Sequence, residues 1–234
     1  MQKLRLDIWS DIACPWCYIG KRHLEQALET FEHKDDVEIV WRAYELDPTA
    51  PKQRKDVTSN VERLAKKYRV PEAQAIAMMD RVIGAGEAAG LDLKLHETKS
   101  GNTFDAHRLL HWALEHGKQD ALKERMLKAY MTEGVVISDP DVLVAIATDV
   151  GLDETEARAV VESDRYAADV RADEKLAGEL GITGVPFFVL ANKIGVSGAQ
   201  PVETMKLVLQ KAWAERPQLE QFAEGAACGP DGCD

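Results

Sequence analysis

The sequence predicts an α/β domain interrupted by a large inserted α-helical domain. Strand-like segments occur only near the two ends of the 234-residue chain, and the segment between them contains helix after helix. A pair of cysteines also falls where the first strand meets the first helix. We therefore divide the chain into residues 1–48 and 165–216, which form the α/β domain, residues 49–164, which form the insertion, and a tail of residues 217–234.

The N-terminal part has a strand–helix–strand pattern. Leu4, Leu6 and Ile8 alternate with charged or bulky residues, which is typical of a strand. Apolar residues then recur at helical spacing from about Pro15 to Thr30, and proline is favoured in the first turn of a helix. The segment Val37–Trp41 predicts the second strand.

The insertion begins after a proline-rich break at residues 48–51. Capping residues and terminal glycines delimit its helices. The predicted helices are Val57–Tyr68, Pro71–Ala89, Thr103–His116, Asp120–Thr132, Asp139–Val150 and Asp153–Ser163.

The α/β pattern returns in the last third of the chain. A helix at Tyr166–Leu180 precedes strands at Gly184–Leu190 and Ile194–Val196, and Pro201 opens a final helix. From Arg216 onward the sequence predicts an extended tail.

Composition and charge exclude several classes of protein. Hydrophobic residues make up 45% of the chain, which is ordinary for a globular protein, and the net charge of -11 argues against a nucleic-acid partner. No apolar run is long enough to span a bilayer, so we expect no membrane association. Charges interrupt the N-terminal segment throughout, as they would not in a signal peptide, and the expected location is cytoplasmic.

The four cysteines form two close pairs, Cys14 with Cys17 and Cys228 with Cys233. A disulfide-stabilised secreted fold spreads its cysteines to join distant segments. These pairs join no distant segments, so we predict that they are chemically reactive.

The Cys14-Pro15-Trp16-Cys17 segment has the spacing and position of a thioredoxin-like redox motif. A helix N-terminus stabilises an anion, so Cys14 is predicted to be the nucleophile with a low pKa. Cys17, one turn into the helix, would be more buried and would resolve the mixed disulfide. Pro15 and Trp16 carry no charge, so the pKa shift is expected to come from the helix, and Asp11 would oppose it if buried.

Beyond this motif, three segments accompany it in the order found in a known family. They are residues 102–109 (Asn-Thr-Phe-Asp-Ala-His-Arg-Leu), 181–188 (Gly-Ile-Thr-Gly-Val-Pro-Phe-Phe) and 195–200 (Gly-Val-Ser-Gly-Ala-Gln). Together with the cysteine motif, they resemble the FrnE-type branch of the DsbA superfamily over about residues 4–213. The resemblance implies a thioredoxin-like fold with an inserted helical domain.

The resemblance also implies a cis peptide bond between Val185 and Pro186 that faces the active site. The backbone of Val185 could then pair with a bound substrate strand. The alternative from the residues alone is that Pro186 merely begins an edge strand.

These features predict a thiol–disulfide oxidoreductase or isomerase that acts on protein disulfides. It would need no cofactor beyond its redox-active cysteines, with glutathione as a possible reductant. Its partners would be thiol- or disulfide-containing client proteins and a thioredoxin- or glutathione-type reductant, and its role could include repair of disulfides formed in oxidative stress. Two alternatives stay open: a kappa-class type glutathione-linked transferase or isomerase, whose relatives carry serine at the first cysteine, and a chaperone-like binder that uses the helical domain.

Cys228 and Cys233 enclose Gly-Pro-Asp-Gly, a sequence that favours a tight β-turn and brings its ends close enough for a disulfide. We predict an auxiliary redox pair that exchanges electrons with Cys14–Cys17 or with a reductase; the alternative is an inert tail. A zinc site built from all four cysteines is disfavoured by the Pro-Trp spacer, and no metal is expected. His107 and His111 lie at i, i+4 spacing but lack a Glu-x-x-His context, so they are interpreted as surface or packing histidines.

Overall fold

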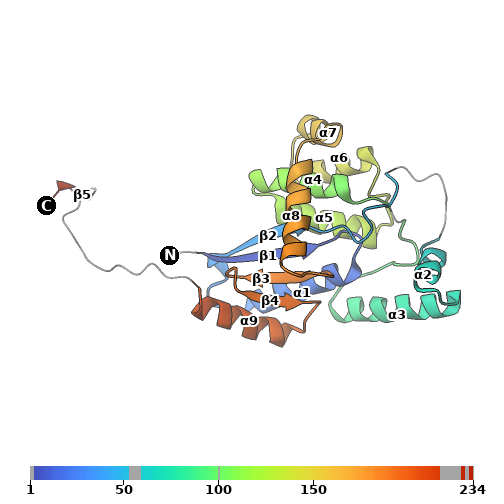
Figure 1. The fold of residues 1–234 in the computed structure, drawn as a ribbon, viewed down its shortest axis with the longest axis horizontal. Coiled ribbons are helices and arrows are strands. Elements are labelled where there is room, and N and C mark those ends of the chain that lie inside the picture. Colours follow the sequence, from blue (N-terminus) through green and yellow to red (C-terminus); the bar gives the residue numbers. More distant parts are fainter. Residues whose placement is uncertain (1–2, 53–58, 100, 217–227, 230–231, 234) are drawn as a thin grey trace.

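A computed structural model describes residues 3–52, 59–99, 101–216, 228–229 and 232–233 (Figure 1). Four strands form one sheet in the order β2-β1-β3-β4. Strand β1 pairs parallel to β2 and antiparallel to β3, and β3 pairs antiparallel to β4. The strands are β1 (Leu4–Ser10), β2 (Val37–Ala43), β3 (Phe187–Leu190) and β4 (Ile194–Ser197). This mixed sheet with its helices confirms the thioredoxin-like α/β fold class.

The helices follow the predicted order. Helix α1 (Pro15–Glu29) and a short 3-10 helix (Lys34–Asp36) connect β1 to β2, and α8 (Ala167–Glu179) and α9 (Val202–Ala214) flank the β3–β4 hairpin. The inserted helices are α2 (Asn60–Tyr68), α3 (Glu72–Ala88), α4 (Phe104–Glu115), α5 (Gln119–Met131), α6 (Pro140–Asp149) and α7 (Glu154–Val161).

The start of the third strand differs most from its sequence prediction. Strand β3 begins at Phe187, whereas the sequence pattern placed the start at Gly184. The preceding residues form a loop with a cis peptide bond between Val185 and Pro186. Residues 184–186 form a bend, and Pro186 has no backbone N–H to donate to a neighbouring strand, so the strand begins only at Phe187.

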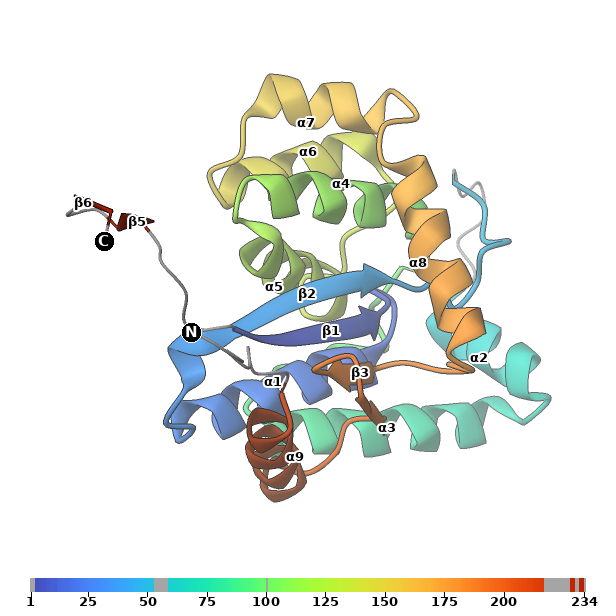
Figure 2. The same ribbon diagram turned by 60° about the vertical axis from the view of Figure 1, so that its left-hand side comes forward.

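Helices cover both faces of the sheet (Figure 2). Helices α1 and α9 lie on one face, where Leu4, Leu6 and Ile8 join their apolar core. Helices α5 and α8 contact β2 on the other side. The alternating residues of β1 are therefore buried as well: Trp9 is 2% exposed and its indole donates to the Asp173 carbonyl at 2.9 Å.

The insertion shares a core with the α/β part. Ile12, Tyr18 and Ile19 belong to the same buried apolar cluster as α4, α5 and α6. The insertion is therefore packed directly against the start of α1. The division at residues 48/49 and 164/165 stays a prediction about folding units.

Within the described ranges, none of the helices combines the length and the apolar character that a bilayer crossing requires.

Candidate active site

Cys14 occupies the N-cap position of α1. Its backbone is extended (φ -97°, ψ 110°), Pro15 follows in the first turn, and no side chain caps the helix. The Cys17 N–H donates to the Cys14 carbonyl at 3.0 Å, which places Cys17 one turn further in. Cys14 is 5% exposed and Cys17 is 0% exposed, so only the first sulfur can be reached from outside.

The loop before β3 faces this helix start. The Val185–Pro186 bond is cis, the isomer that the resemblance implies, and the Cys14 thiol donates to the Val185 carbonyl at 3.4 Å. Gly20 on α1 permits the close approach, because a Cβ there would lie 3.0 Å from the Cγ of Pro186. Segments distant in sequence thus meet at the reactive sulfur.

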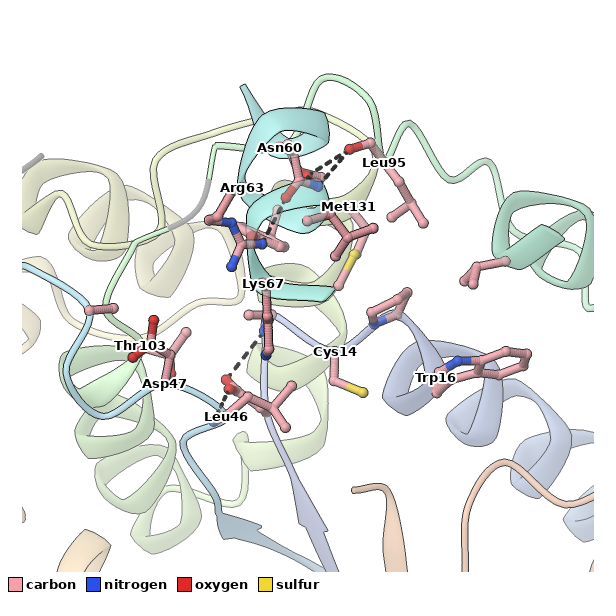
Figure 3. Close-up of a pocket in the computed structure, with 18 of the residues that line it drawn as sticks. Cys14, Trp16, Leu46, Asp47, Asn60, Arg63, Lys67, Leu95, Thr103 and Met131 are labelled. Carbon is pink, nitrogen blue, oxygen red and sulfur yellow. Dashed lines mark hydrogen bonds between the residues drawn. The ribbon is translucent and has the colours of Figure 1, made fainter. Parts of the chain in front are cut away.

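A cavity of about 420 Å³ opens in front of Cys14 (Figure 3). Its walls come from the start of α1, the loop after β2, helices α2 and α3, and the cis-proline loop. Trp16 lies at its edge and is 44% exposed. Arg63 and Lys67 reach into the cavity from α2, so the space combines an accessible sulfur, an apolar ring and two cations.

Burial, the contact between the two thiols and neighbouring charges all act on the acidity of the dithiol. The hydrogen bond to Cys17, followed by burial, raises the pKa of Cys14 well above its ordinary value, and the charge of Asp11 adds to the rise. Burial also opposes ionisation of Cys17, but the hydrogen bond from Cys14 and the charge of Lys123 outweigh it and lower the pKa of Cys17. Burial and the charge of Asp11 therefore oppose the effect of the helix N-terminus on Cys14, and its role as the nucleophile with a low pKa stays a prediction.

Lys123 is the residue that sequence analysis missed. It lies on α5 and is 0% exposed, with its ammonium 3.5 Å from the Ser10 carbonyl and 5.4 Å from the centre of the Trp41 ring. A signal was available: Lys123 shares a helical face with the apolar Leu127 and Tyr130 at i+4 and i+7 spacing. A lysine on a buried face is a candidate functional group.

Asp11 and His107 form a second buried polar contact. The Nε2 atom of His107 lies 3.5 Å from Oδ1 of Asp11, and the Asp11 carboxylate accepts from the N–H groups of Leu46 and Ala13. Burial tends to raise the pKa of Asp11, but these contacts lower it overall, whereas burial lowers the pKa of His107. His107 is a buried packing histidine, and the expected opposition of Asp11 to Cys14 ionisation is confirmed.

His111 is also mostly buried. Its Nε2 lies 2.9 Å from Oδ2 of Asp173, which in turn accepts from Arg42 and from the Ala43 N–H. This contact ties α4 to α8 and β2. Of the two predicted roles, surface or packing, the packing role describes His111.

The second cysteine pair lies in a two-stranded ribbon. Cys228–Gly229 (β5) pairs antiparallel with Gly232–Cys233 (β6), and Cys228 is directly opposite Cys233. The turn residues between them and the side chains of both cysteines lie outside the described residues. The four-cysteine zinc alternative is therefore untested, although within the described ranges no cluster of three or more His, Cys, Asp or Glu residues could hold a metal ion.

The sheet topology, the dithiol at the helix start and the facing cis-proline loop together define a thioredoxin-like dithiol protein. The family model of the DSBA-like thioredoxin domain matches residues 5–210, and the chain belongs to that family. The chain is thus a thiol–disulfide oxidoreductase of the DsbA superfamily.

Relatives share nearly the whole chain. The crystal structure of a probable DsbA oxidoreductase from Streptomyces coelicolor is 45% identical, covers 99% of this chain and 98% of its own, and superposes with a TM-score of 0.89. The uncharacterized protein YwbO of Bacillus subtilis is 26% identical over 204 residues, 86% of this chain and 94% of that protein. The cytosolic disulfide reductase DsbM of Pseudomonas aeruginosa with GSH shares the fold at 17% identity and a TM-score of 0.62, covering 90% of this chain and 99% of its own.

Proposed function

We propose that this protein reduces or isomerises disulfides in client proteins through Cys14 and Cys17. One observation carries the proposal: the Cys14 sulfur lines an accessible cavity 3.4 Å from the carbonyl that precedes cis-Pro186, while Cys17 is closed off beneath it. A nucleophile that is accessible and a resolving thiol that is not are the two parts that thiol–disulfide exchange needs.

The exchange would proceed in two displacements. The Cys14 thiol loses its proton to solvent and attacks one sulfur of the client disulfide as a thiolate. A mixed disulfide forms, and the other client sulfur leaves as a thiolate that takes up a proton. Cys17 then loses its proton and attacks Cys14, which releases the second client thiol. The client gains two electrons and two protons, and the Cys14–Cys17 pair becomes a disulfide.

The cis-proline loop would hold the client during these steps. In this proposal the backbone of Val185 pairs with an extended client segment next to the mixed disulfide. The surroundings favour the role, because Gly184 and Val185 line the same cavity as Cys14. A reductant must then return two electrons to the oxidised pair, and a thioredoxin- or glutathione-type thiol would supply them.

The proposed direction is reduction or isomerisation, with a role in repairing disulfides formed in oxidative stress. It assumes a reducing cytoplasm, where net oxidation of client proteins is thermodynamically unfavourable. A similarly folded protein, DsbM, is a cytosolic disulfide reductase. The FrnE-type resemblance is part of this proposal.

The C-terminal pair would act as an auxiliary relay. Residues directly opposite in an antiparallel ribbon have Cα atoms about 4.5–5.5 Å apart, within the range that a disulfide requires. Cys228 and Cys233 have this arrangement. We include in the proposal that this pair passes electrons to or from Cys14–Cys17. Replacing both residues by serine should slow turnover, and unchanged turnover with every reductant and client tested would exclude the relay.

A glutathione-linked activity is the second candidate. The cations Arg63 and Lys67 line the cavity that contains Cys14, and a small thiol with carboxylates suits that space. Both cysteines are present, which favours redox exchange with such a thiol over conjugation. The chaperone alternative draws on the exposed Trp16, Leu46 and Tyr68 that line the same cavity, at 44%, 40% and 52% exposure.

The deciding experiment compares the wild-type protein with the Cys14→Ser variant in insulin reduction and in refolding of scrambled ribonuclease. We expect the variant to lose both activities. Wild-type protein that reduces glutathione mixed disulfides but neither protein substrate would overturn the protein-disulfide proposal in favour of the second candidate. Suppression of aggregation that survives the substitution would show a chaperone activity independent of the dithiol.

A further inference from the structure

Two cations in the cavity beside Cys14 have no carboxylate partner among the described residues. Arg63 and Lys67 lie four residues apart on α2, so both project from one face of the helix into the cavity. The Oδ1 atom of Asn60 is the only described acceptor of the Arg63 guanidinium. The chain as a whole has a net charge of -11. A cavity that presents two cations therefore differs from the rest of the molecule and suits an anionic group.

Asn60 holds the Arg63 guanidinium in a fixed orientation. The Nη2 atom of Arg63 donates to Oδ1 of Asn60 at 2.7 Å. The amide of Asn60 donates in turn to the Leu95 carbonyl at 2.9 Å and to Oγ1 of Thr98 at 2.6 Å (Figure 3). Both acceptors belong to the segment between α3 and α4, so Asn60 fixes α2 and Arg63 against the wall of the cavity. A cation that is already oriented loses little freedom when it binds a ligand.

The two carboxylates that line the cavity have partners of their own. Asp47 accepts from the backbone N–H of Thr49 at 3.2 Å and from its hydroxyl at 2.7 Å, within one turn of chain. Asp11 is buried and accepts from two backbone N–H groups. Neither carboxylate pairs with the cations on α2. The positive charge of the cavity is therefore left for a ligand.

The rest of the cavity wall is largely apolar and rich in methionine. Three of the six methionines of the chain line it: Met78 and Met79 on α3 and Met131 at the end of α5. Methionine side chains are flexible and polarisable, and they recur at surfaces that accept varied apolar partners. The cavity of about 420 Å³ falls within the range of about 300–1,000 Å³ found for pockets that hold small ligands. It can therefore admit a side chain beside the reactive sulfur.

We propose that this cavity recognises the residues next to the client cysteine: an apolar side chain enters the methionine-lined part, and a nearby carboxylate pairs with Arg63 and Lys67. The preferred clients are proteins with an apolar and an acidic residue within a few positions of a disulfide. The cations and methionines all belong to the inserted helices. The insertion would therefore select which disulfides reach Cys14.

This inference rests on the proposed function and adds a class of client to it. Glutathione also carries carboxylates near its sulfur, so it shares the anionic half of this chemistry but lacks the apolar side chain. The tests therefore vary the two halves separately.

The first test uses the reduced full chain with Cys228→Ser and Cys233→Ser, so that only Cys14 and Cys17 can react. Its substrates are four peptides whose single cysteine forms a mixed disulfide with uncharged 2-thiopyridine. Each peptide has leucine or serine next to the cysteine and glutamate or glutamine at the following position. Release of pyridine-2-thione gives the second-order rate constant. Dividing it by the rate constant with dithiothreitol corrects for the intrinsic reactivity of each disulfide.

The peptide with leucine and glutamate should react at least about tenfold faster than the peptide with serine and glutamine. Each of the two changes alone should contribute at least about threefold, from partial burial of leucine and from a partly exposed ion pair. Equal corrected rates for all four peptides would overturn this inference and leave the proposed function intact. A retained preference in a protein that cannot reduce insulin would overturn the protein-disulfide proposal alone.

The second test separates the two halves of the cavity in the same background. Replacing Arg63 and Lys67 by glutamine should reduce the preference for glutamate to about onefold and leave the preference for leucine unchanged, because only the ion pairs are lost. Lys66→Gln is the matched control, since Lys66 is exposed on the same helix and does not line the cavity. It should change neither preference.

Replacing Met78 by glutamine should instead reduce the preference for leucine by at least about twofold and leave the preference for glutamate unchanged. Ile76→Gln is its control, because Ile76 is exposed on α3 and does not line the cavity. Loss of both preferences in every variant, controls included, would overturn the assignment to this cavity. So would cation substitutions that slow reduction of glutathione disulfide but leave the preference for glutamate in the peptides. The first test remains decisive if a variant fails to fold.

Discussion

The two cysteines of one motif face opposite environments. The space in front of Cys14 is an accessible cavity of about 420 Å³ with an exposed tryptophan and two cations on its walls. The layer behind Cys17 is closed to water and holds Lys123 and the hydroxyl of Ser10. The first region can admit a client, and the second can hold charge and protons.

This difference shows that the route of access and the buried charge lie on opposite sides of the dithiol. A thiolate fully open to solvent needs little help from the protein, whereas a buried thiolate requires a fixed counter-charge. In this chain the inserted helices contribute to both regions: α2 supplies the cavity cations, and α5 supplies the buried ammonium. The insertion is therefore part of the reactive centre as well as a cover for it.

Removing each of the two sulfurs in turn should have the largest effect and is the strongest test of this comparison. We expect Cys14→Ser to lower disulfide-exchange turnover by about a thousandfold or more, because the accessible nucleophile is gone. Cys17→Ser should instead accumulate a mixed disulfide at Cys14, detectable by mass spectrometry of the intact protein. Accumulation on the Cys14→Ser variant would show that the buried sulfur is the one that clients reach.

The electrostatic cost of the closed region can be measured as stability. In the oxidised protein at pH 7, Lys123→Met should raise the free energy of unfolding by about 1–3 kcal/mol, because the substitution removes a buried charge. Burial lowers the pKa of Lys123 from 10.5 to about 8, so the unfolded chain holds this proton more tightly. The destabilisation caused by burying the Lys123 ammonium is therefore fully present below the pKa of Lys123 in the folded protein. It decreases as the pH rises from there toward 10.5.

Denaturant unfolding of both proteins, from pH 7 to 10.5, checks this prediction. The stability advantage of Lys123→Met should shrink across that range. Without thiolates to hold the proton on Lys123, the decrease should begin no higher than about pH 8. An advantage that stays constant up to pH 10.5 would indicate a packing effect and not a charge effect.

The open region should respond more weakly to loss of charge. Replacing Arg63 and Lys67 by glutamine should raise the KM for glutathione disulfide by about 3- to 10-fold, since partly exposed charges each contribute about 0.3–1 kcal/mol. Lys66→Gln is the matched control, because Lys66 is exposed on the same helix and does not line the cavity. An equal effect of all three substitutions, or no decrease of the effect in high salt, would contradict a role for these two cations.

The smallest expected effect concerns the spacing between α1 and the cis-proline loop. In Gly20→Ala, the new methyl would meet Pro186 at 3.0 Å and Phe188 at 3.4 Å. The cis-proline loop would have to move by a few tenths of an ångström, which should lower turnover about 2- to 5-fold. The same strain should offset the gain in stability of about 0.5–1 kcal/mol that replacing glycine by alanine normally brings to a helix. Gly84→Ala on α3, where nothing lies within 4 Å, should stabilise the protein and leave turnover unchanged. Equal turnover of the two variants would show that this contact does not position the loop.

Local features of the sequence were enough to predict the order of the helices and strands. Alternation, helical spacing, capping residues and terminal glycines act within a few residues of each other, so a single sequence contains them. The same holds for the position of Cys14 and Cys17 at the start of α1. The start of β3 was misplaced because residues 184–186 have a strand-like sequence, and only the tertiary structure shows that they bend at a cis peptide bond.

The electrostatics of the site could not be inferred in the same way. The acidity of the dithiol depends on Asp11, Lys123 and the mutual contact of the two thiols, and only the tertiary structure decides their distances and burial. Lys123 lies on α5, far from Cys17 along the chain, and no local pattern relates the two residues. Short-range patterns therefore predict the motif and the order of the elements. The charges that act on the dithiol are set by long-range packing, because charge acts through space and is strengthened by the exclusion of water.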